Sequence, residues 1–254
     1  MTNDKNYIHL GGTARSPEDV VSLHELGLQF AEIPITDNDK FIRLKNTYKE
    51  LKENSGMYYL CHGPREGDPN DIKALENSYF PKLIQILSGM PDLDMRLLTI
   101  HLWIDPRFVS REAISYKIGF LNRLIDKGRE AGITICLENL SETATHLSGV
   151  FKVLPLLNLT LDIGHAQLLS NQNTSYGFID RFPERIKHVH IHDNRGGDSP
   201  DDDLHLPVGK GIIEFGKIFR KVKEIGYHGT ITLELRPPEI KTCLPYVKQL
   251  LHIS

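Results

Sequence analysis

The stretch Leu159-Thr-Leu-Asp-Ile-Gly-His165 carries the pattern that decides the fold. An apolar run ends in a carboxylate, Asp162, and His165 follows three residues later, after a glycine. A carboxylate at the end of a buried strand, with an imidazole on the turn that leaves it, is a metal-ligand arrangement. A structural explanation is equally simple, because Asp is a favoured helix N-cap and a histidine can lie at the surface. The recurrence of the pattern along the chain favours the metal.

Further apolar runs of strand length occur at regular intervals on both sides of this stretch. They predict strands over residues 7–10, 30–33, 57–61, 96–100, 133–137, 159–161, 186–193 and 229–233. Amphipathic patterns, capping residues and terminating glycines predict helices between them. The expected helices cover residues 16–26, 39–54, 70–88, 110–131, 145–154, 213–225 and 239–251, with 180–184 as a loop or a short helix.

Alternating strands and helices imply parallel strands joined by crossover helices. The strands are apolar along most of their length, as expected for strands buried on both faces. Eight such units in 254 residues predict one closed (β/α)8 TIM barrel, with residues 1–254 as a single domain. The alternative is an open doubly wound sheet. That sheet would need a glycine-rich phosphate turn after the first strand, and Gly11-Gly12, which we expect to break that strand, is an incomplete version of it.

The composition is that of an ordinary globular protein, with 40% hydrophobic and 25% charged residues. A net charge of -3 does not favour a nucleic-acid partner. The first residues lack a signal-peptide core, and no apolar run is long enough for a membrane helix. The three cysteines are widely separated, which fits reduced thiols in a cytoplasmic protein. The sequence leaves the oligomeric state open, and a homo-oligomer is one alternative.

Six consecutive predicted strands end in a residue type that binds metals. Because the carboxyl ends of barrel strands form the catalytic face, we expect these side chains to meet. A cluster of imidazoles and carboxylates suits Zn, Mn, Co or Fe and argues against Ca. We therefore predict a divalent metal, Zn or Mn, at this face. The six are His62, His101, Glu138, Asp162, His190 and Glu234, and the turns that follow add His165, Asp203 and His205.

The motifs of strands three to eight resemble the xylose isomerase-like TIM barrel superfamily, which contains sugar isomerases, sugar epimerases and endonuclease IV. The resemblance rests on Cys61-His-Gly-Pro64, Ile100-His101, Leu137-Glu-Asn139, Leu161-Asp-Ile-Gly-His165, His190-Ile-His-Asp193, Asp203-Leu-His-Leu-Pro-Val-Gly-Lys-Gly211 and Leu233-Glu-Leu235.

The resemblance implies how the ligands would be shared. The metal common to the family would be held by Glu138, Asp162, His190 and Glu234. A second ion, as in endonuclease IV, would use His62, His101 and Glu138. A third would use His165, Asp203 and His205, so the set allows one to three ions per chain. Many sugar isomerases of the family also carry the Asp-x-His loop, so the full set does not decide the reaction.

A sugar or sugar-phosphate isomerase or epimerase is the first functional interpretation. The metal would polarise the carbonyl of an open-chain ketose. Glu138 and Glu234 would then exchange a proton with the neighbouring carbon through an enediolate. An inosose dehydration or a hydroxypyruvate isomerisation would use the same ligands. Expected substrate contacts are His165, Arg236, Trp103 and His192. A salt bridge explains Arg236 as well, loop packing explains Trp103, and an exposed turn explains His192.

A trinuclear zinc phosphodiesterase that cleaves abasic DNA is the alternative. Such an enzyme grips and bends a duplex with basic and wedge-forming loops. Here the loop over residues 63–71 is acidic and has no large apolar wedge, and the loop over 198–203 contains four Asp. The loops therefore favour the isomerase. Of the remaining polar residues, we expect His188 to have a core hydrogen-bonding role, and His9 or Glu32 to support the ligands without binding the metal.

Overall fold

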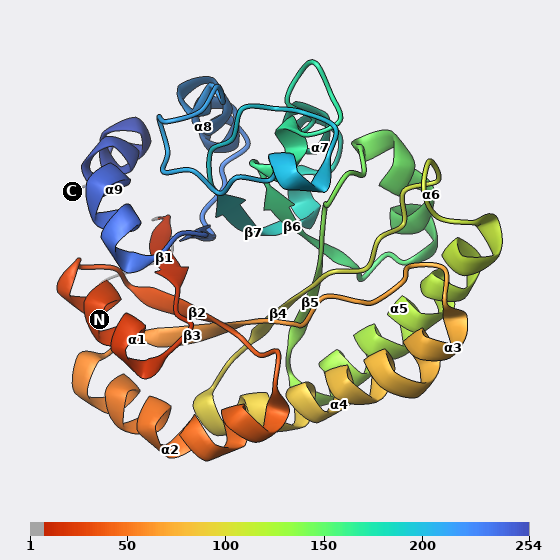
Figure 1. Cartoon of the computed structure of the whole chain (residues 1–254), viewed down its shortest axis with the longest axis horizontal. Coiled ribbons are helices and arrows are strands. Elements are labelled where there is room, and N and C mark those ends of the chain that lie inside the picture. The colour runs from red at the N-terminus through yellow and green to blue at the C-terminus, as the bar shows by residue number, and fades with distance from the viewer. Residues whose placement is uncertain (1–7, 254) are drawn as a thin grey trace.

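The computed structural model describes residues 8–253. Eight strands close a parallel barrel in which each pairs with the next in chain order and β8 pairs with β1 (Figure 1). The predicted barrel is confirmed, and the open sheet is excluded. The strands are β1 His9–Thr13, β2 Phe30–Pro34, β3 Tyr58–His62, β4 Leu97–Ile100, β5 Thr134–Glu138, β6 Asn158–Asp162, β7 Ile186–Ile191 and β8 Thr230–Leu233.

Helices surround the barrel and connect successive strands (Figure 1). The principal ones are α1 Pro17–Glu25, α2 Asn38–Ser55, α3 Ile72–Ala74, α4 Phe80–Gly89, α5 Arg111–Ala131, α6 Ala144–Val153, α7 Ser175–Arg181, α8 Phe215–Glu224 and α9 Pro237–Leu251. No helix in residues 8–253 is long and apolar enough to cross a membrane.

The helix predicted over 70–88 is not regular. A π-helical turn, Leu75–Tyr79, separates α3 from α4. Pro81 has no amide hydrogen to donate to residue 77, so regular α-helical bonding is interrupted at this point. Residues 180–184, expected as a loop or a short helix, contain the end of α7 and the start of a 3-10 turn, Pro183–Arg185.

The prediction that Gly11 and Gly12 break the first strand is wrong, because both glycines lie inside β1. A side chain at Gly11 would overlap the ring of Phe30, and one at Gly12 would overlap Leu23. Close packing therefore explains both glycines, against a neighbouring strand at Gly11 and against helices at Gly12, and neither is explained by a turn. Tyr7, where the predicted strand begins, lies outside the described residues.

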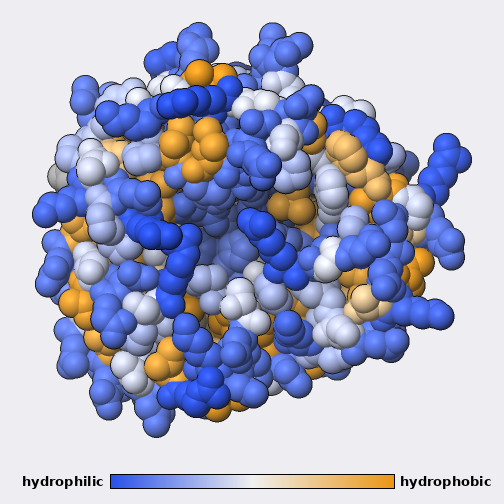
Figure 2. All heavy atoms as spheres, viewed as in Figure 1, coloured by the Kyte–Doolittle hydropathy of each residue, from blue (hydrophilic) through white to orange (hydrophobic). Residues whose placement is uncertain are grey.

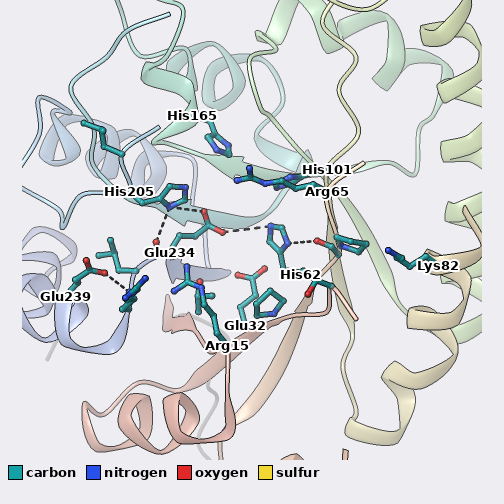
Figure 3. Close-up of a pocket in the computed structure, with 18 residues that line it drawn as sticks. Arg15, Glu32, His62, Arg65, Lys82, His101, His165, His205, Glu234 and Glu239 are labelled. Carbon is teal, nitrogen blue, oxygen red and sulfur yellow. Dashed lines mark hydrogen bonds and ion pairs between the residues drawn. The ribbon is translucent and has the colours of Figure 1, made fainter. Parts of the chain in front are cut away.

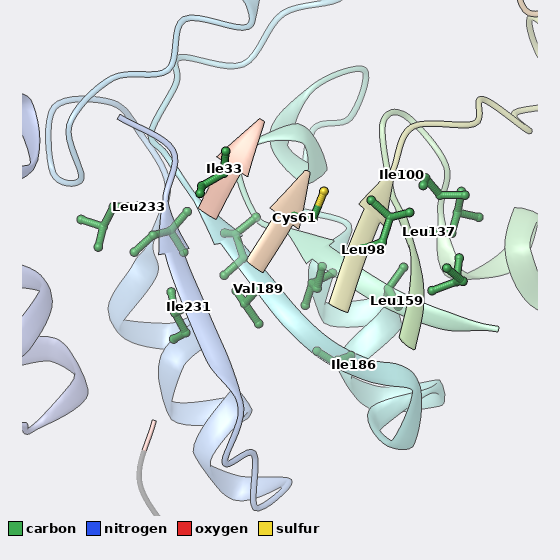
Figure 4. Packing of buried hydrophobic residues seen from close by; sticks show 14 of the residues in the cluster. Ile33, Cys61, Leu98, Ile100, Leu137, Leu159, Ile186, Val189, Ile231 and Leu233 are labelled. Carbon is green, nitrogen blue, oxygen red and sulfur yellow. The ribbon is translucent and has the colours of Figure 1, made fainter. Parts of the chain in front are cut away.

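Successive side chains of a strand face alternately the apolar core and the interior of the barrel, where the site lies. In β7, Val189 and Ile191 belong to the large apolar cluster between barrel and helices, shown in part in Figure 4. His188 and His190, which alternate with them, both contact Glu32 of β2 across the barrel interior. Because strand side chains repeat every two residues, the last inward residue of each strand lies at the carboxyl end of the barrel.

Candidate metal centre and active site

The predicted ligands occupy this last inward position. Glu138 follows Cys136 by two residues, Asp162 follows Thr160, and His190 follows His188. Glu138, Asp162 and His190 are fully buried, and Glu234, which follows β8, keeps 13% of its side chain exposed at the cavity floor. The barrel thus places four ligand-type side chains on a single floor. We call these four residues the central cluster.

The central cluster surrounds the Nδ1 atom of His190. This nitrogen lies 3.2 Å from Glu234 Oε1, 3.5 Å from Glu138 Oε1 and 3.8 Å from Asp162 Oδ2. One ligand atom of each of the four residues lies within 4.8 Å of all the others. These are the spacings at which a single ion can be held by several protein atoms.

Three of these atoms lack a hydrogen-bond partner among residues 8–253, namely Glu138 Oε1, Asp162 Oδ2 and His190 Nδ1. A buried polar atom without a partner is costly, and several that converge on one point call for an explanation. A divalent cation held by Glu138, Asp162 and His190 would satisfy all three. The residues present therefore fit a metal.

Glu138 also extends the site on its other side. Its Oε2 atom lies 2.8 Å from Nε2 of His101 and 3.2 Å from Nε2 of His62. Burial opposes ionisation of Glu138, but the neighbouring imidazoles of His101 and His190 outweigh it and hold its pKa well below the ordinary value. Glu138 is therefore an ionised carboxylate that lies between two groups of ligand-type side chains.

A second group, the outer cluster, consists of His165, His192, Asp203 and His205, whose ligand atoms also lie within 4.8 Å of one another. Asp203 Oδ2 lies 3.3 Å from Nε2 of His165 and 3.2 Å from Nε2 of His205. The rings of His192 and His205 stack with centroids 3.8 Å apart. Asp203 Oδ1 has no hydrogen-bond partner among the described residues.

His192 differs from the position that the sequence suggested. It is fully buried and does not form part of an exposed mouth. Its Nε2 atom lies 3.3 Å from Asp162 Oδ1 and 3.9 Å from Asp203 Oδ1. This places its imidazole between the two clusters.

A buried carboxylate, Asp193, fixes the long loop that carries Asp203 and His205. Its two oxygens accept hydrogen bonds from the backbone amides of Asn194, Gly209, Gly211 and Ile213. Asp193 and Leu206 also exchange backbone hydrogen bonds of 2.7 Å. The loop is thus ordered by one carboxylate, a role that the sequence did not reveal although its Gly-x-Gly amides are typical of such contacts.

Glu32 supports His190 from below. Its Oε2 atom lies 3.0 Å from Nε2 of both His188 and His190, and its side chain is 1% exposed. A ligating histidine commonly donates its second N–H to a carboxylate, which fixes its tautomer and orientation. His188 also contacts the Thr230 hydroxyl at 2.6 Å, and His9 contacts Tyr58. The hydrogen bond to Glu32 leaves Nδ1 of His190 free to bind a metal.

The clusters open into a cavity of about 810 Å³. Figure 2 shows the corresponding hollow, lined mostly by hydrophilic residues, and Figure 3 shows His62, His101, His165, His205 and Glu234 around it. Arg236 also borders this cavity. Trp103 borders an adjoining cavity of about 400 Å³, where its ring stacks on Phe108 and its indole N–H donates to Ser141.

A closed (β/α)8 barrel with imidazoles and carboxylates gathered at the carboxyl ends of its strands has its potential active site where enzymes of this architecture carry theirs. The sequence profile described as xylose isomerase-like TIM barrel matches residues 20–248. The chain belongs to this family, as the motifs of strands three to eight predicted.

The chain is also similar to individual known proteins. An uncharacterized protein of Methanocaldococcus jannaschii is 32% identical over 199 residues, 73% of this chain and 67% of its own length. Inosose dehydratase of Lacticaseibacillus casei is 29% identical over 133 residues, 45% of this chain and 44% of the enzyme. The crystal structure of a D-tagatose 3-epimerase-like protein superposes with a TM-score of 0.84 at 22% identity, over 96% of this chain and 97% of that one.

Proposed function

We propose that the chain is a divalent-metal-dependent isomerase or epimerase of a sugar or sugar phosphate. The observation that carries this proposal is the central cluster, where unpartnered atoms of the buried Glu138, Asp162 and His190 converge with Glu234. Glu234 lines a cavity of about 810 Å³. A cavity of this size accommodates a monosaccharide. Relatives and structural neighbours named as sugar epimerases and inosose dehydratase support the same class of substrate.

Glu138, Asp162, His190 and Glu234 would hold the ion. When bound, it supplies polarisation of the substrate carbonyl, which acidifies the hydrogen on the neighbouring carbon. Glu138 is held ionised and can accept that proton. Glu234 borders the cavity and can return a proton to the other face of the carbon. His165 and Arg236 would bind substrate oxygens, and Trp103 would form an apolar wall.

Exchange of the substrate's carbon-bound hydrogen with solvent tests this mechanism. The chain is purified, stripped with a chelator, reloaded with Mn, Co or Zn, and incubated in deuterated water with a panel of ketoses, ketose phosphates and an inosose. We expect deuterium at the carbon next to the carbonyl, only with metal present. Absence of exchange on every substrate with a metal-loaded chain would contradict the proposal.

A second candidate is the phosphodiesterase that acts on abasic DNA. The outer cluster is compatible with it, because ligand atoms of His165, Asp203 and His205 lie close enough to hold a further ion. The acidic loops with no large apolar wedge disfavour it. Nicking of an abasic duplex by the zinc-loaded chain, without ketose activity, would select this candidate.

A further inference from the structure

The wall of the cavity is basic, whereas its floor is acidic. Four cationic side chains line the cavity of about 810 Å³, and they come from separate parts of the chain. Arg15 follows β1, Arg65 follows β3, Arg236 follows β8, and Lys82 lies on α4. In Figure 3, Arg15 and Arg65 extend into the cavity from opposite sides.

These cations are not neutralised by carboxylates of residues 8–253. Within that range, none of Arg15, Arg65, Lys82 and Arg236 lies within ion-pair distance of an Asp or Glu. The adjoining rim is different. There Glu66, the residue that follows Arg65, pairs with Lys117 at 2.9 Å. The carboxylate beside Arg65 is thus directed to another partner, and the guanidinium remains available for a ligand.

Glu239 is the acidic residue of the cavity lining nearest in sequence to Arg236. Its Oε2 atom accepts a hydrogen bond of 2.9 Å from the backbone amide of Arg236, at the start of α9. The Glu239 carboxylate thus contacts the backbone of Arg236 and forms no ion pair with its guanidinium. Loops after the last two strands are where many (β/α)8 barrels bind a substrate phosphate.

We propose that Arg15, Arg65 and Arg236 form an anion subsite, and that the natural substrate is a ketose carrying a phosphate group. This inference rests on the proposed function and specifies its substrate class. The guanidinium group presents paired N–H donors that match the oxygens of a phosphate. The phosphate lies at the basic wall, and the carbonyl end of the sugar lies at the central cluster. The acidic loop over 198–203 borders the adjoining cavity, which Arg65 also lines, and it does not line the cavity that Arg15 and Arg236 border.

Binding of inorganic phosphate to the metal-loaded chain tests the subsite without relying on turnover. The variants are Arg65→Gln and Arg236→Gln, and the control is Lys210→Gln, which removes one exposed positive charge that does not line the cavity. Each arginine variant should raise the Kd for phosphate about tenfold, as expected for the loss of a charge-assisted hydrogen bond. The control should leave it within about twofold, and metal content should be unchanged in all three.

A ketose and its phosphate ester, compared in kcat/KM, complete the test. We expect the ester to be preferred at least about tenfold by the natural chain, and the preference to fall in Arg65→Gln. Phosphate binding that is equal in the arginine variants and the natural chain overturns the subsite, even if ketoses react. Arginine-dependent phosphate binding with no reaction on either sugar overturns the proposed function and leaves the subsite standing.

Discussion

The central and outer clusters use the same residue types but are built differently. Glu138, Asp162 and His190 lie on barrel strands and are fully buried, and Glu32 supports His190 from below. In the outer cluster, Asp203 and His205 lie on a loop, and His205 keeps 31% of its side chain exposed. Strand-borne ligands are positioned by the fold itself, whereas loop-borne ligands depend on local hydrogen bonds. The central cluster is therefore suited to the chemistry shared by a family, and the outer one to what distinguishes its members.

Removing the charge of Glu138, in the central cluster, should have the largest effect on activity. Glu138→Gln keeps the shape but lowers the basicity of the group that accepts the proton, so we expect kcat to fall about 10²–10⁴-fold. Steady-state kinetics on the best ketose measures this. Glu130→Gln, an exposed substitution on α5, is the control. An unchanged kcat for Glu138→Gln would remove Glu138 from the mechanism.

The support beneath His190 should matter for the metal more than for folding. Glu32→Gln weakens the hydrogen bond that orients the His190 ring, so we expect metal affinity to fall about 10–100-fold. Isothermal titration calorimetry with the metal measures this affinity, and thermal unfolding of the metal-free protein is measured in parallel. A loss of stability with unchanged metal affinity would assign Glu32 a purely structural role.

Releasing the loop should affect only the outer cluster. Asp193→Asn removes the carboxylate that accepts hydrogen bonds from four backbone amides. This should lower the free energy of unfolding by about 1–3 kcal/mol and expose residues 194–213 to proteases. Limited proteolysis locates the cleavage. Asp201→Asn, on the same loop but exposed, serves as the control. Equal cleavage in both variants would show that Asp193 does not order the loop.

The smallest expected effect is a pH dependence of the metal-free protein. Burial disfavours protonated His62 and His205, but carboxylates, mainly Glu138 for His62 and Asp203 for His205, raise each pKa to about 9. A folded pKa above the unfolded value of about 6.5 gives stability that is present below pH 6.5 and is lost as the pH rises through 9. Denaturant unfolding at pH 6.5 and 9 measures the loss. Equal stability at both values would contradict it.

The residues at the strand ends could be predicted because the alternation of side chains along a strand and the order of strands in a barrel both follow the order of the chain. Eight apolar runs gave the barrel, and the polar residues at the ends of six of them gave the ligand-type side chains that the structure brings together, such as Asp162. Contacts across the barrel could not be predicted in the same way. Glu32 and His190 are 158 residues apart, and nothing in either strand identifies the other. The position of Gly11 likewise depends on the ring of Phe30 in a neighbouring strand.

Metal content per chain tests the central claim most directly. Elemental analysis would compare the natural chain, purified without chelator or added metal, with Asp162→Asn and Asp203→Asn. We predict that the natural chain and Asp203→Asn retain about one divalent ion in the central cluster, and that Asp162→Asn loses it. About three zinc ions in the natural chain would move the phosphodiesterase ahead of the isomerase. No metal in the natural chain, even after titration, would contradict the account.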